Sequence, residues 1–226
     1  MKIGIIGAGH IGGTLTRRLT ALGHDVSVAN SRGPETLHSL AKETGARPTT
    51  VHDAAHDKDL VIVTIPERSV RDLPRDLFAG ERTVVVVDTG NYYPKRDGRI
   101  SSIEEGQTES SWVAEQLGRP VVKAFNTIYA DHLLKRGRAA DQAGRIALPV
   151  AGDDKAAKAV VMRLIDELGF DAVDAGTLTE SWKQQPGTPV YGADLPADGV
   201  RRALDEARRE RKPEFRASTP TSPRAG

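Results

Sequence analysis

The sequence predicts an α/β fold: a doubly wound, mostly parallel sheet in a single domain with a C-terminal extension. Apolar stretches of strand length alternate with amphipathic stretches of helix length through most of the 226 residues. Some of the apolar stretches are continuous, which is typical of strands that helices cover on both faces. Alternation of this kind favours parallel strands joined by right-handed helical crossovers.

The first ninety residues hold most of the expected strand–helix units. We expect strands at residues 2–6, 25–29, 47–51, 60–65 and 83–87. Between them we expect helices at residues 11–22, 34–45, 53–57 and 69–80. In the first helix, Ile11, Leu15 and Leu19 recur on one face, and Gly23 ends the helix.

The rest of the chain continues the alternation and then loses it. We expect a helix at 110–117, a strand at 120–125, a polar loop at 135–143, a strand at 146–151, a helix at 154–168 and a strand at 170–173. Residues 1–178 thus form the sheet domain. Residues 179–212 are expected to be an extension, a polar loop followed by a charged helix from residue 198. Residues 213–226 are expected to be a disordered tail, because Ser, Thr and Pro dominate most of it.

The pattern Gly7-x-Gly9-x-x-Gly12 lies between the first strand and the first helix. Gly7 permits a tight turn, Gly9 lets the backbone approach a pyrophosphate, and Gly12 lets the helix pack against the sheet. The helix N-terminus offers free N–H groups and the positive end of the helix dipole to phosphate. Because strand, turn, helix and second strand occur in the required order, the pattern predicts a Rossmann-type dinucleotide site.

The residues after the second strand indicate which dinucleotide binds. A site for NAD usually has a carboxylate here, bonded to the ribose 2′-hydroxyl. This chain has Asn30, Ser31 and Arg32 instead. All three can donate to a 2′-phosphate, and Arg can do so as a planar fork. We therefore predict NADP(H); the alternative is that Arg32 is a solvated loop residue and the cofactor is NAD(H).

Other segments are expected at the same edge, since ligands of open α/β sheets bind beyond the carboxyl ends of the strands. They are Thr64-Ile65-Pro66, residues 88–91 and residues 124–127. We expect them to line the adenosine–ribose end and the nicotinamide, although Pro66 alternatively only ends its strand. Lys123 alternates with apolar neighbours and is either a covered polar residue near the cofactor or an edge residue.

No pattern for acid–base or nucleophilic catalysis stands out in the sequence. Six histidines are scattered along the chain. We expect His10 to point outward from the glycine loop, the alternative being that it neighbours the pyrophosphate. We expect His132 to lie on a helix surface, the alternative being that it reaches a substrate. Hydride transfer needs positioning and a dry site, while the cofactor supplies the chemistry. The sequence therefore leaves the catalytic residues open.

Composition excludes several other classes of protein. The 32 Lys and Arg against 31 Asp and Glu give a formal net charge of +1, and aromatic residues make up only 4%, so neither nucleic acid nor a membrane is expected as a partner. There is no cysteine, which excludes disulfides and thiolate sites. With no apolar signal region at the N-terminus, we expect a cytoplasmic protein. Arg208, Arg209, Arg211 and Lys212 alternate with acidic residues, so we expect a solvated helix end rather than a site for an anionic partner.

Several segments resemble a known family. They are IGIIGAGHIGGTLTRRL with NSRGPE, then VVDTGNYYP, VKAFNT, LPVAGDD and LGFDAVDAGTL with ESW, in this order within residues 1–182. They are similar to the deazaflavin-dependent NADP reductases, also called coenzyme F-420:NADP oxidoreductases. They also resemble the cytoplasmic oxidoreductase domains of the six-transmembrane epithelial antigen of prostate metalloreductases, whose membrane segments this chain lacks.

The resemblance implies NADPH held with its nicotinamide facing a flavin or deazaflavin ring, with direct hydride transfer between the rings. It implies site residues in four segments. The pyrophosphate loop corresponds to Gly7, Ala8, Gly9, His10, Ile11 and Gly12, and the 2′-phosphate site to Asn30, Ser31 and Arg32. The loop over the adenine-side ribose corresponds to Thr64, Ile65 and Pro66, and the segment near the nicotinamide to Lys123, Ala124, Phe125 and Asn126. The QQPGTPVY segment and the C-terminal helix have no counterpart in this assignment.

Two other functions are compatible with the sequence. One is reduction of a small carbonyl or imine, as in the β-hydroxyacid dehydrogenases, although about fifty residues after Val173 are few for their helical domain. The other is a non-catalytic NADP(H) sensor that binds partners through its C-terminal helix. For the enzyme we expect a flavin-type or other small-molecule hydride acceptor and a homodimer. Trp182 and Tyr191 cap the acceptor cleft, contact the second subunit, or pack in the core.

Overall fold

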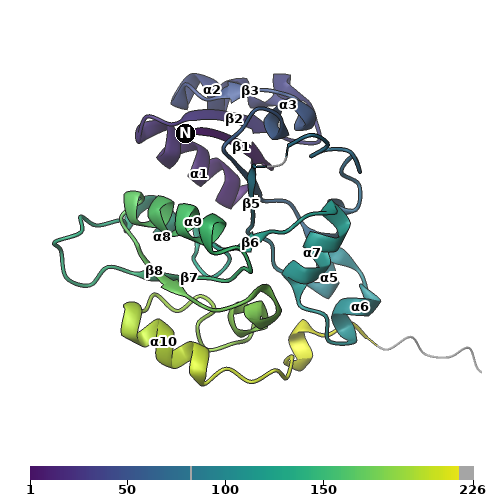
Figure 1. Ribbon diagram of the computed structural model, residues 1–226, viewed down its shortest axis with the longest axis vertical. Coiled ribbons are helices and arrows are strands. Elements are labelled where there is room, and N and C mark those ends of the chain that lie inside the picture. The colour runs from purple at the N-terminus through teal and green to yellow at the C-terminus, as the bar shows by residue number, and fades with distance from the viewer. Residues whose placement is uncertain (82, 219–226) are drawn as a thin grey trace, which may run out of the picture.

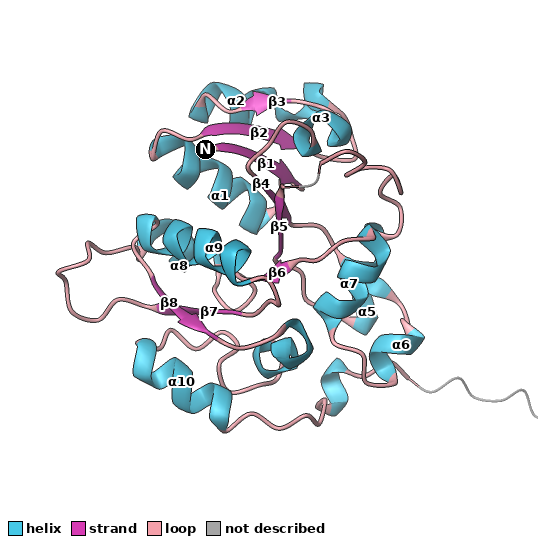
Figure 2. Ribbon diagram, viewed as in Figure 1, coloured by secondary structure: helices cyan, strands magenta, loops and turns pink. Residues whose placement is uncertain are grey.

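The strand order of the main sheet is that of a dinucleotide-binding Rossmann fold. The computed structural model describes residues 1–81 and 83–218. Six parallel strands pair in the order β3-β2-β1-β4-β5-β6 (Figure 2). The strand order reverses between β1 and β4, which is the topological switch point of the sheet. Their bounds are β1 Lys2–Ile6, β2 Asp25–Ala29, β3 Arg47–Pro48, β4 Leu60–Val63, β5 Val85–Asp88 and β6 Val122–Lys123. The predicted fold class is confirmed, and β1 and β2 have the predicted bounds.

Helices cover both faces of this sheet, which explains the continuous apolar strands (Figure 1). One apolar core includes Leu15 and Leu19 from α1 and Leu164 from α9; the other includes Ala54 from α3 and Val113 from α7. The helices are α1 His10–Ala21, α2 His38–Thr44, α3 Val51–Ala55, α4 Glu67–Val70, α5 Pro94–Asp97, α6 Ser101–Glu104, α7 Glu109–Leu117, α8 Ala130–Lys135, α9 Lys155–Glu167 and α10 Ala197–Asp205. Three 3-10 helices are η1 Pro34–Leu37, η2 Leu178–Gln184 and η3 Pro213–Phe215.

The last predicted strand–helix–strand unit does not extend the main sheet. β7 (Ala147–Val150) and β8 (Asp171–Asp174) form a separate parallel pair. A single antiparallel bridge between Lys123 and Ala151 connects this pair to β6. β6 has only two residues, so it offers little edge for a full parallel neighbour. α10 covers the small sheet through Val200, Ala203 and Leu204.

Two predicted helices are much shorter in the structure. The helix expected at 69–80 is wrong, because α4 ends at Val70 and turns follow. Pro74 lies inside that range and lacks the N–H that a continuing helix needs. The charged helix expected at 198–212 also ends early, at Asp205.

The segment after α10 lies against the body of the protein. Figure 1 shows it running from α10 back to α6. Arg209 Nη2 donates to the Gly106 carbonyl at 3.2 Å, and the Ala217 amide donates to Glu104 Oε1 at 2.9 Å. The disorder expected from residue 213 therefore differs from the structure at 213–218, while 219–226 lie outside the described residues. Among the described helices, none combines the length and apolar character needed to cross a bilayer.

Candidate functional site

A cavity of about 710 Å³ opens at the carboxyl ends of β1, β2 and β4. We call it the glycine-loop cavity. It lies at the switch point of the sheet, where ligands of doubly wound folds bind. Three segments form most of its wall, and each follows one of these strands. The lining residues are Ile6, Gly7, Ala8, Gly9, Asn30, Ser31, Arg32, Val51, Thr64, Ile65, Pro66, Ser69, Asp72, Leu73 and Pro74.

Two of the three glycines are required by the fold itself. Gly7 has a φ of 110°, and a Cβ there would lie 2.6 Å from the Thr64 carbonyl oxygen. A Cβ on Gly12 would lie 1.9 Å from the Gly7 carbonyl oxygen, so only glycine lets α1 start this close to β1. The Thr64 hydroxyl donates to the same Gly7 carbonyl at 2.7 Å and fixes the turn against β4.

Gly9 is different, because the fold does not need it. Its backbone is extended, with φ −75° and ψ −160°, and an added Cβ would meet nothing within 4 Å. The free space is at the N-terminus of α1, whose cap lacks a side-chain hydrogen bond and whose first turn has no acidic residue. Such an end attracts an anion. The geometry therefore fits a pyrophosphate in the space that a Cβ on Gly9 would enter.

The loop after β2 is ordered by Asn30. Asn30 Oδ1 accepts the backbone N–H of Arg32 at 2.9 Å, and its Nδ2 donates to Thr36 Oγ1 at 2.9 Å. The amide is thus occupied with the loop, whereas Ser31 and Arg32 are exposed and line the cavity. Ser31 and Arg32 are therefore the available donors for a 2′-phosphate.

The structure brings nine of the sixteen predicted site residues into one cavity: Gly7, Ala8, Gly9, Asn30, Ser31, Arg32, Thr64, Ile65 and Pro66. His10 is exposed and lines an adjacent cavity of about 600 Å³, which Arg32 also borders. Ile11 packs against the core, and Gly12 is buried behind the loop. The sequence reasoning missed Val51 and the wall from Ser69 to Pro74, because it placed residues 69–80 in a helix.

The predicted nicotinamide segment is buried. Lys123, Ala124 and Phe125 are 0% exposed, and Asn126 is 5% exposed. Phe125 has a φ of 62°, which is uncommon for a residue with a side chain and marks a sharp change of direction after β6. These four residues lie behind the surface in this conformation, so their contribution to a nicotinamide site remains a prediction.

Lys123 belongs to a buried charged cluster, which we define as Glu67, Asp88, Glu109 and Lys123. These side chains are at most 2% exposed. Lys123 Nζ donates to Asp88 Oδ2 at 3.0 Å and to the Gly90 carbonyl at 2.5 Å. Lys123 is therefore a covered polar residue, which is the first of the two alternatives.

Two arginines reach the cluster from other segments. Arg96 Nη2 lies 2.7 Å from Glu67 Oε2, and Arg211 Nη2 lies 3.0 Å from Glu109 Oε1. Arg211 comes from the segment after α10, so the end of the chain neutralises a charge buried in α7. Sequence reasoning did not find this contact, because its partners are 102 positions apart.

Burial shifts the protonation of the cluster. The pKa of Glu67 is raised well above its ordinary value, first by burial and then by the Glu109 carboxylate. Burial also raises the pKa of Glu109. Although burial opposes its charge, the pKa of Lys123 is raised, because Asp88, Glu109 and Glu67 surround it. Glu67 Oε1 and Glu109 Oε2 have no hydrogen-bond partner among the described residues, and burial beside a second carboxylate favours the protonated form of Glu67 more than water does.

Amide side chains connect the end of β6 with the C-terminal extension. Asn126 Nδ2 donates to Asn91 Oδ1 at 3.0 Å and to the Gln184 carbonyl at 2.7 Å. Gln184 Nε2 donates in turn to Asn126 Oδ1 at 2.9 Å. The first glutamine of the QQPGTPVY segment thus holds the predicted nicotinamide segment in place.

The two aromatic residues of the extension lie in different surroundings. The Tyr191 hydroxyl is hydrogen-bonded to the Tyr93 hydroxyl, and burial raises the pKa of both phenols. Trp182 instead lines a separate cavity beside α6. His132 Nδ1 lies 2.7 Å from Asp194 Oδ2, so this ring is paired on the surface of α8, as predicted.

The fold and the glycine-loop cavity define a class, the Rossmann-type dinucleotide-binding proteins. The family model "NADP oxidoreductase coenzyme F420-dependent" matches residues 2–92. A solved structure of the hypothetical protein SMa0349 from Sinorhizobium meliloti is 33% identical, with a TM-score of 0.76, covering 87% of this chain and 95% of that one. The chain belongs to this family of NADP oxidoreductases.

Two further relatives agree with this assignment. A solved Arthrobacter sp. FB24 structure, assigned as an F420-dependent NADP reductase, is 27% identical with a TM-score of 0.67, covering 80% of this chain and 87% of that one. The metalloreductase STEAP3 of Rattus norvegicus is 28% identical over 183 residues, which are 80% of this chain and 35% of the relative. The chain spans between 35% and 55% of the length of the curated relatives it matches. The family that the sequence segments resemble is thus confirmed.

Proposed function

We propose that the protein transfers a hydride between NADP(H) and a flavin or deazaflavin acceptor. The observation that carries the proposal is the glycine-loop cavity, with free space at Gly9 and the exposed Arg32 at its edge. The assignment of the Arthrobacter relative as an F420-dependent NADP reductase supports the acceptor class.

The residues present fit NADP(H) from the pyrophosphate to the adenosine. The loop from Gly7 to Gly12 and the N-terminus of α1 would hold the pyrophosphate. Ser31 and Arg32 would donate to the 2′-phosphate. The ribose and adenine would be enclosed by Thr64, Ile65 and Pro66 on one side and by Leu73 and Pro74 on the other wall of the cavity.

The chemistry at the other end requires positioning rather than proton transfer by the protein. When bound, NADPH would supply the hydride from its nicotinamide ring. Asn91 and Asn126 bond to each other beyond the ends of β5 and β6, and Gln184 bonds to Asn126. Their amides are fixed by these bonds, so they would orient the ring region without exchanging protons. No catalytic residue of this chain is assigned.

Stopped-flow absorbance tests this proposal. The protein is mixed with NADPH and then with a flavin, a deazaflavin or a panel of small imines, and loss of NADPH absorbance is followed. We expect oxidation with a flavin or deazaflavin only. Oxidation by imines alone would replace the proposal with the imine-reductase alternative. Tight NADPH binding without oxidation by any acceptor would favour the sensor.

We also propose a homodimer and a cytoplasmic location. Tyr129 is 57% exposed and Leu134 is 36% exposed, and both are large apolar side chains at α8. Such residues are enriched at subunit contacts. Sedimentation equilibrium should give twice the chain mass; a monomer across the concentration range would remove the dimer from the proposal.

A further inference from the structure

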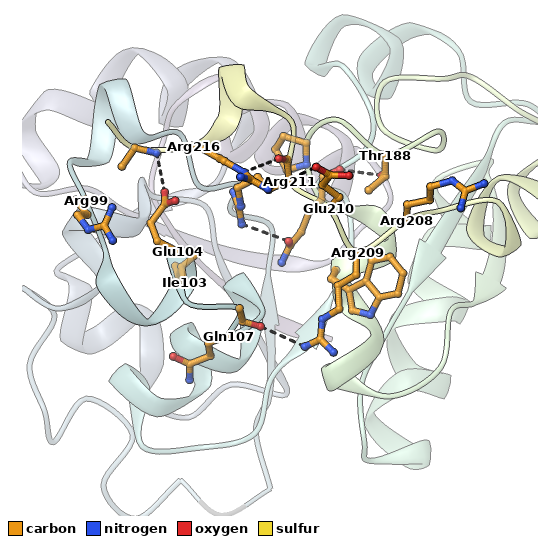
Figure 3. A pocket seen from close by; sticks show the side chains of 15 residues that line it. Arg99, Ile103, Glu104, Gln107, Thr188, Arg208, Arg209, Glu210, Arg211 and Arg216 are labelled. Carbon is orange, nitrogen blue, oxygen red and sulfur yellow. Dashed lines mark hydrogen bonds and ion pairs between the residues drawn. The ribbon is translucent and has the colours of Figure 1, made fainter. Parts of the chain in front are cut away.

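A further cavity, of about 570 Å³, lies between the α6–α7 region and the segment after α10 (Figure 3). We call it the arginine cavity, because five arginines line it: Arg99, Arg208, Arg209, Arg211 and Arg216. Its volume is within the range of small-molecule pockets. Nothing in the proposed function uses it.

The charges that line the arginine cavity are unbalanced. Two carboxylates, Glu104 and Glu210, line the cavity with the five arginines, and a third, Glu109, pairs with Arg211. Glu104 is already engaged, since it accepts the Ala217 amide at 2.9 Å. Glu210 lies 3.9 Å from Arg216. The wall therefore carries an excess of positive charge.

Two of the arginines are available to a ligand. Arg209 and Arg211 are bonded to Gly106 and Glu109. Within the described part of the chain, neither Arg99 nor Arg208 makes a side-chain hydrogen bond or ion pair, and both side chains are exposed. Figure 3 shows them on opposite sides of the cavity. Their guanidinium groups can each bind a phosphate or carboxylate as a planar fork.

Gln185 is an independent sign of a ligand. It is 8% exposed and lines the cavity, and its Nε2 has no hydrogen-bond partner among the described residues. Its Oε1 accepts from Arg211 Nη2 at 3.4 Å, which leaves the amide nitrogen free to donate. Buried donors in proteins are almost always paired, so this one calls for an acceptor atom from outside the chain.

We propose that the arginine cavity binds a small organic molecule with two or more phosphate or carboxylate groups. Arg99 and Arg208 bind the anionic groups, Gln185 Nε2 donates to one of their oxygens, and Trp182 offers an apolar wall. Two sources carry this chemistry: the anionic part of the hydride acceptor, or a free metabolite. The adjacent residue Gln184 bonds to Asn126, so a single dipeptide joins this cavity to the predicted nicotinamide segment.

Calorimetry tests the site without using the proposed function. The full chain is saturated with NADPH, to occupy the glycine-loop cavity, and is titrated with inorganic pyrophosphate or citrate. We expect saturable binding of one equivalent, at least about tenfold weaker in R99A/R208A. The control R201A/R202A removes two exposed arginines of α10 and should bind as the unchanged protein does. No saturable binding, or equal weakening in both variants, would overturn the proposal.

A single substitution examines the buried amide. Q185E keeps an acceptor for Arg211 but replaces the free donor with a carboxylate. We expect anion binding to fall at least about tenfold while NADPH affinity and the thermal midpoint stay unchanged. Unaltered anion binding in a folded Q185E protein would contradict the assignment of Gln185. Because NADPH binding is measured on the same samples, failure here is distinguishable from failure of the proposed function.

Steady-state oxidation of NADPH distinguishes the two sources. The acceptors are FAD, which carries two phosphate groups, and riboflavin, which carries none. If the acceptor's own anionic groups occupy the cavity, FAD has the lower KM, pyrophosphate competes with it, and R99A/R208A removes the preference. If a free metabolite binds, the two flavins have equal KM values and pyrophosphate changes the rate without competing. Of the three experiments, only this steady-state measurement depends on the proposed function.

Discussion

The two halves of the carboxyl edge of the main sheet differ in where their charged and polar groups lie: one half exposes them and the other buries them. Beyond β1 and β2, the chain presents a glycine loop, a helix N-terminus and the exposed Arg32 around an open cavity. Beyond β5 and β6, it buries Asp88 and Glu109 around Lys123, together with Glu67 from the segment after β4, and closes the cluster with Arg96 and Arg211. The first half has donors that lack a partner among residues 1–81 and 83–218, whereas the second satisfies most of its charges internally.

This difference distinguishes residues that bind a ligand from residues that stabilise the fold. An open, preorganised set of donors gains free energy only when an anion arrives. A buried ion cluster makes its contribution during folding, and it is sensitive to the loss of any one member. We therefore expect substitutions in the first half to change ligand affinity, and substitutions in the second half to change the free energy of unfolding.

The largest expected effect is that of Lys123→Met. Without Nζ, Asp88, Glu67 and Glu109 lose their shared buried cation. We expect the free energy of unfolding to fall by about 3–5 kcal/mol, measured by urea denaturation at neutral pH. Lys135→Met removes a lysine whose pair with Asp131 is exposed, and it should leave the unfolding midpoint unchanged. Equal small effects of the two variants would show that the cluster adds nothing to stability.

Arg32→Ala tests the open half. We expect a loss of about 1–3 kcal/mol in NADPH binding and little change in NADH binding, because only NADPH carries the 2′-phosphate. Isothermal titration calorimetry with both nucleotides measures this difference. Arg47→Ala, which removes another exposed arginine at β3, should change neither affinity. Equal losses of NADPH and NADH affinity in Arg32→Ala would rule out the 2′-phosphate assignment.

A smaller effect is expected from the protonation of Glu67. Folding raises the pKa of Glu67 from its ordinary value of 4.5, so its protonated form stabilises the folded state. That stabilisation is complete below pH 4.5 and is lost as pH rises toward the higher folded-state pKa. Glu67→Gln cannot ionise, so its stability relative to the unchanged protein should increase with pH over this window. Urea denaturation from pH 4 to pH 8 checks the trend, and a difference that is constant with pH would contradict it.

The comparison also explains what sequence reasoning could predict. The glycine loop, Asn30–Arg32 and Thr64–Pro66 each follow a strand whose pattern is local, so their meeting at one edge follows from the topology of the fold. Nine of these residues line one cavity. The wall from Ser69 to Pro74 was missed because residues 69–80 were expected to form a helix, which Pro74 does not continue.

The second half depends on contacts that no local pattern reveals. Lys123 was left open between a covered and an edge position, and Arg211 was assigned to a solvated helix end. The position of Lys123 is decided by Asp88, the Gly90 carbonyl and the bridge to Ala151. That of Arg211 is decided by the segment after α10, which returns to α6 and α7 and places Arg211 beside Glu109. Contacts over such a sequence separation depend on tertiary packing, which overrides the periodicity of a charged segment.

The most direct test of the glycine-loop site is Gly9→Ala. The backbone there is one that alanine adopts, and the added Cβ meets no atom of the chain within 4 Å, so the free energy of unfolding should change by less than about 1 kcal/mol. Calorimetric titration with NADPH should nevertheless show binding at least about tenfold weaker, because the methyl group would occupy the space of the pyrophosphate. NADPH binding equal to that of the unchanged protein would place the dinucleotide elsewhere.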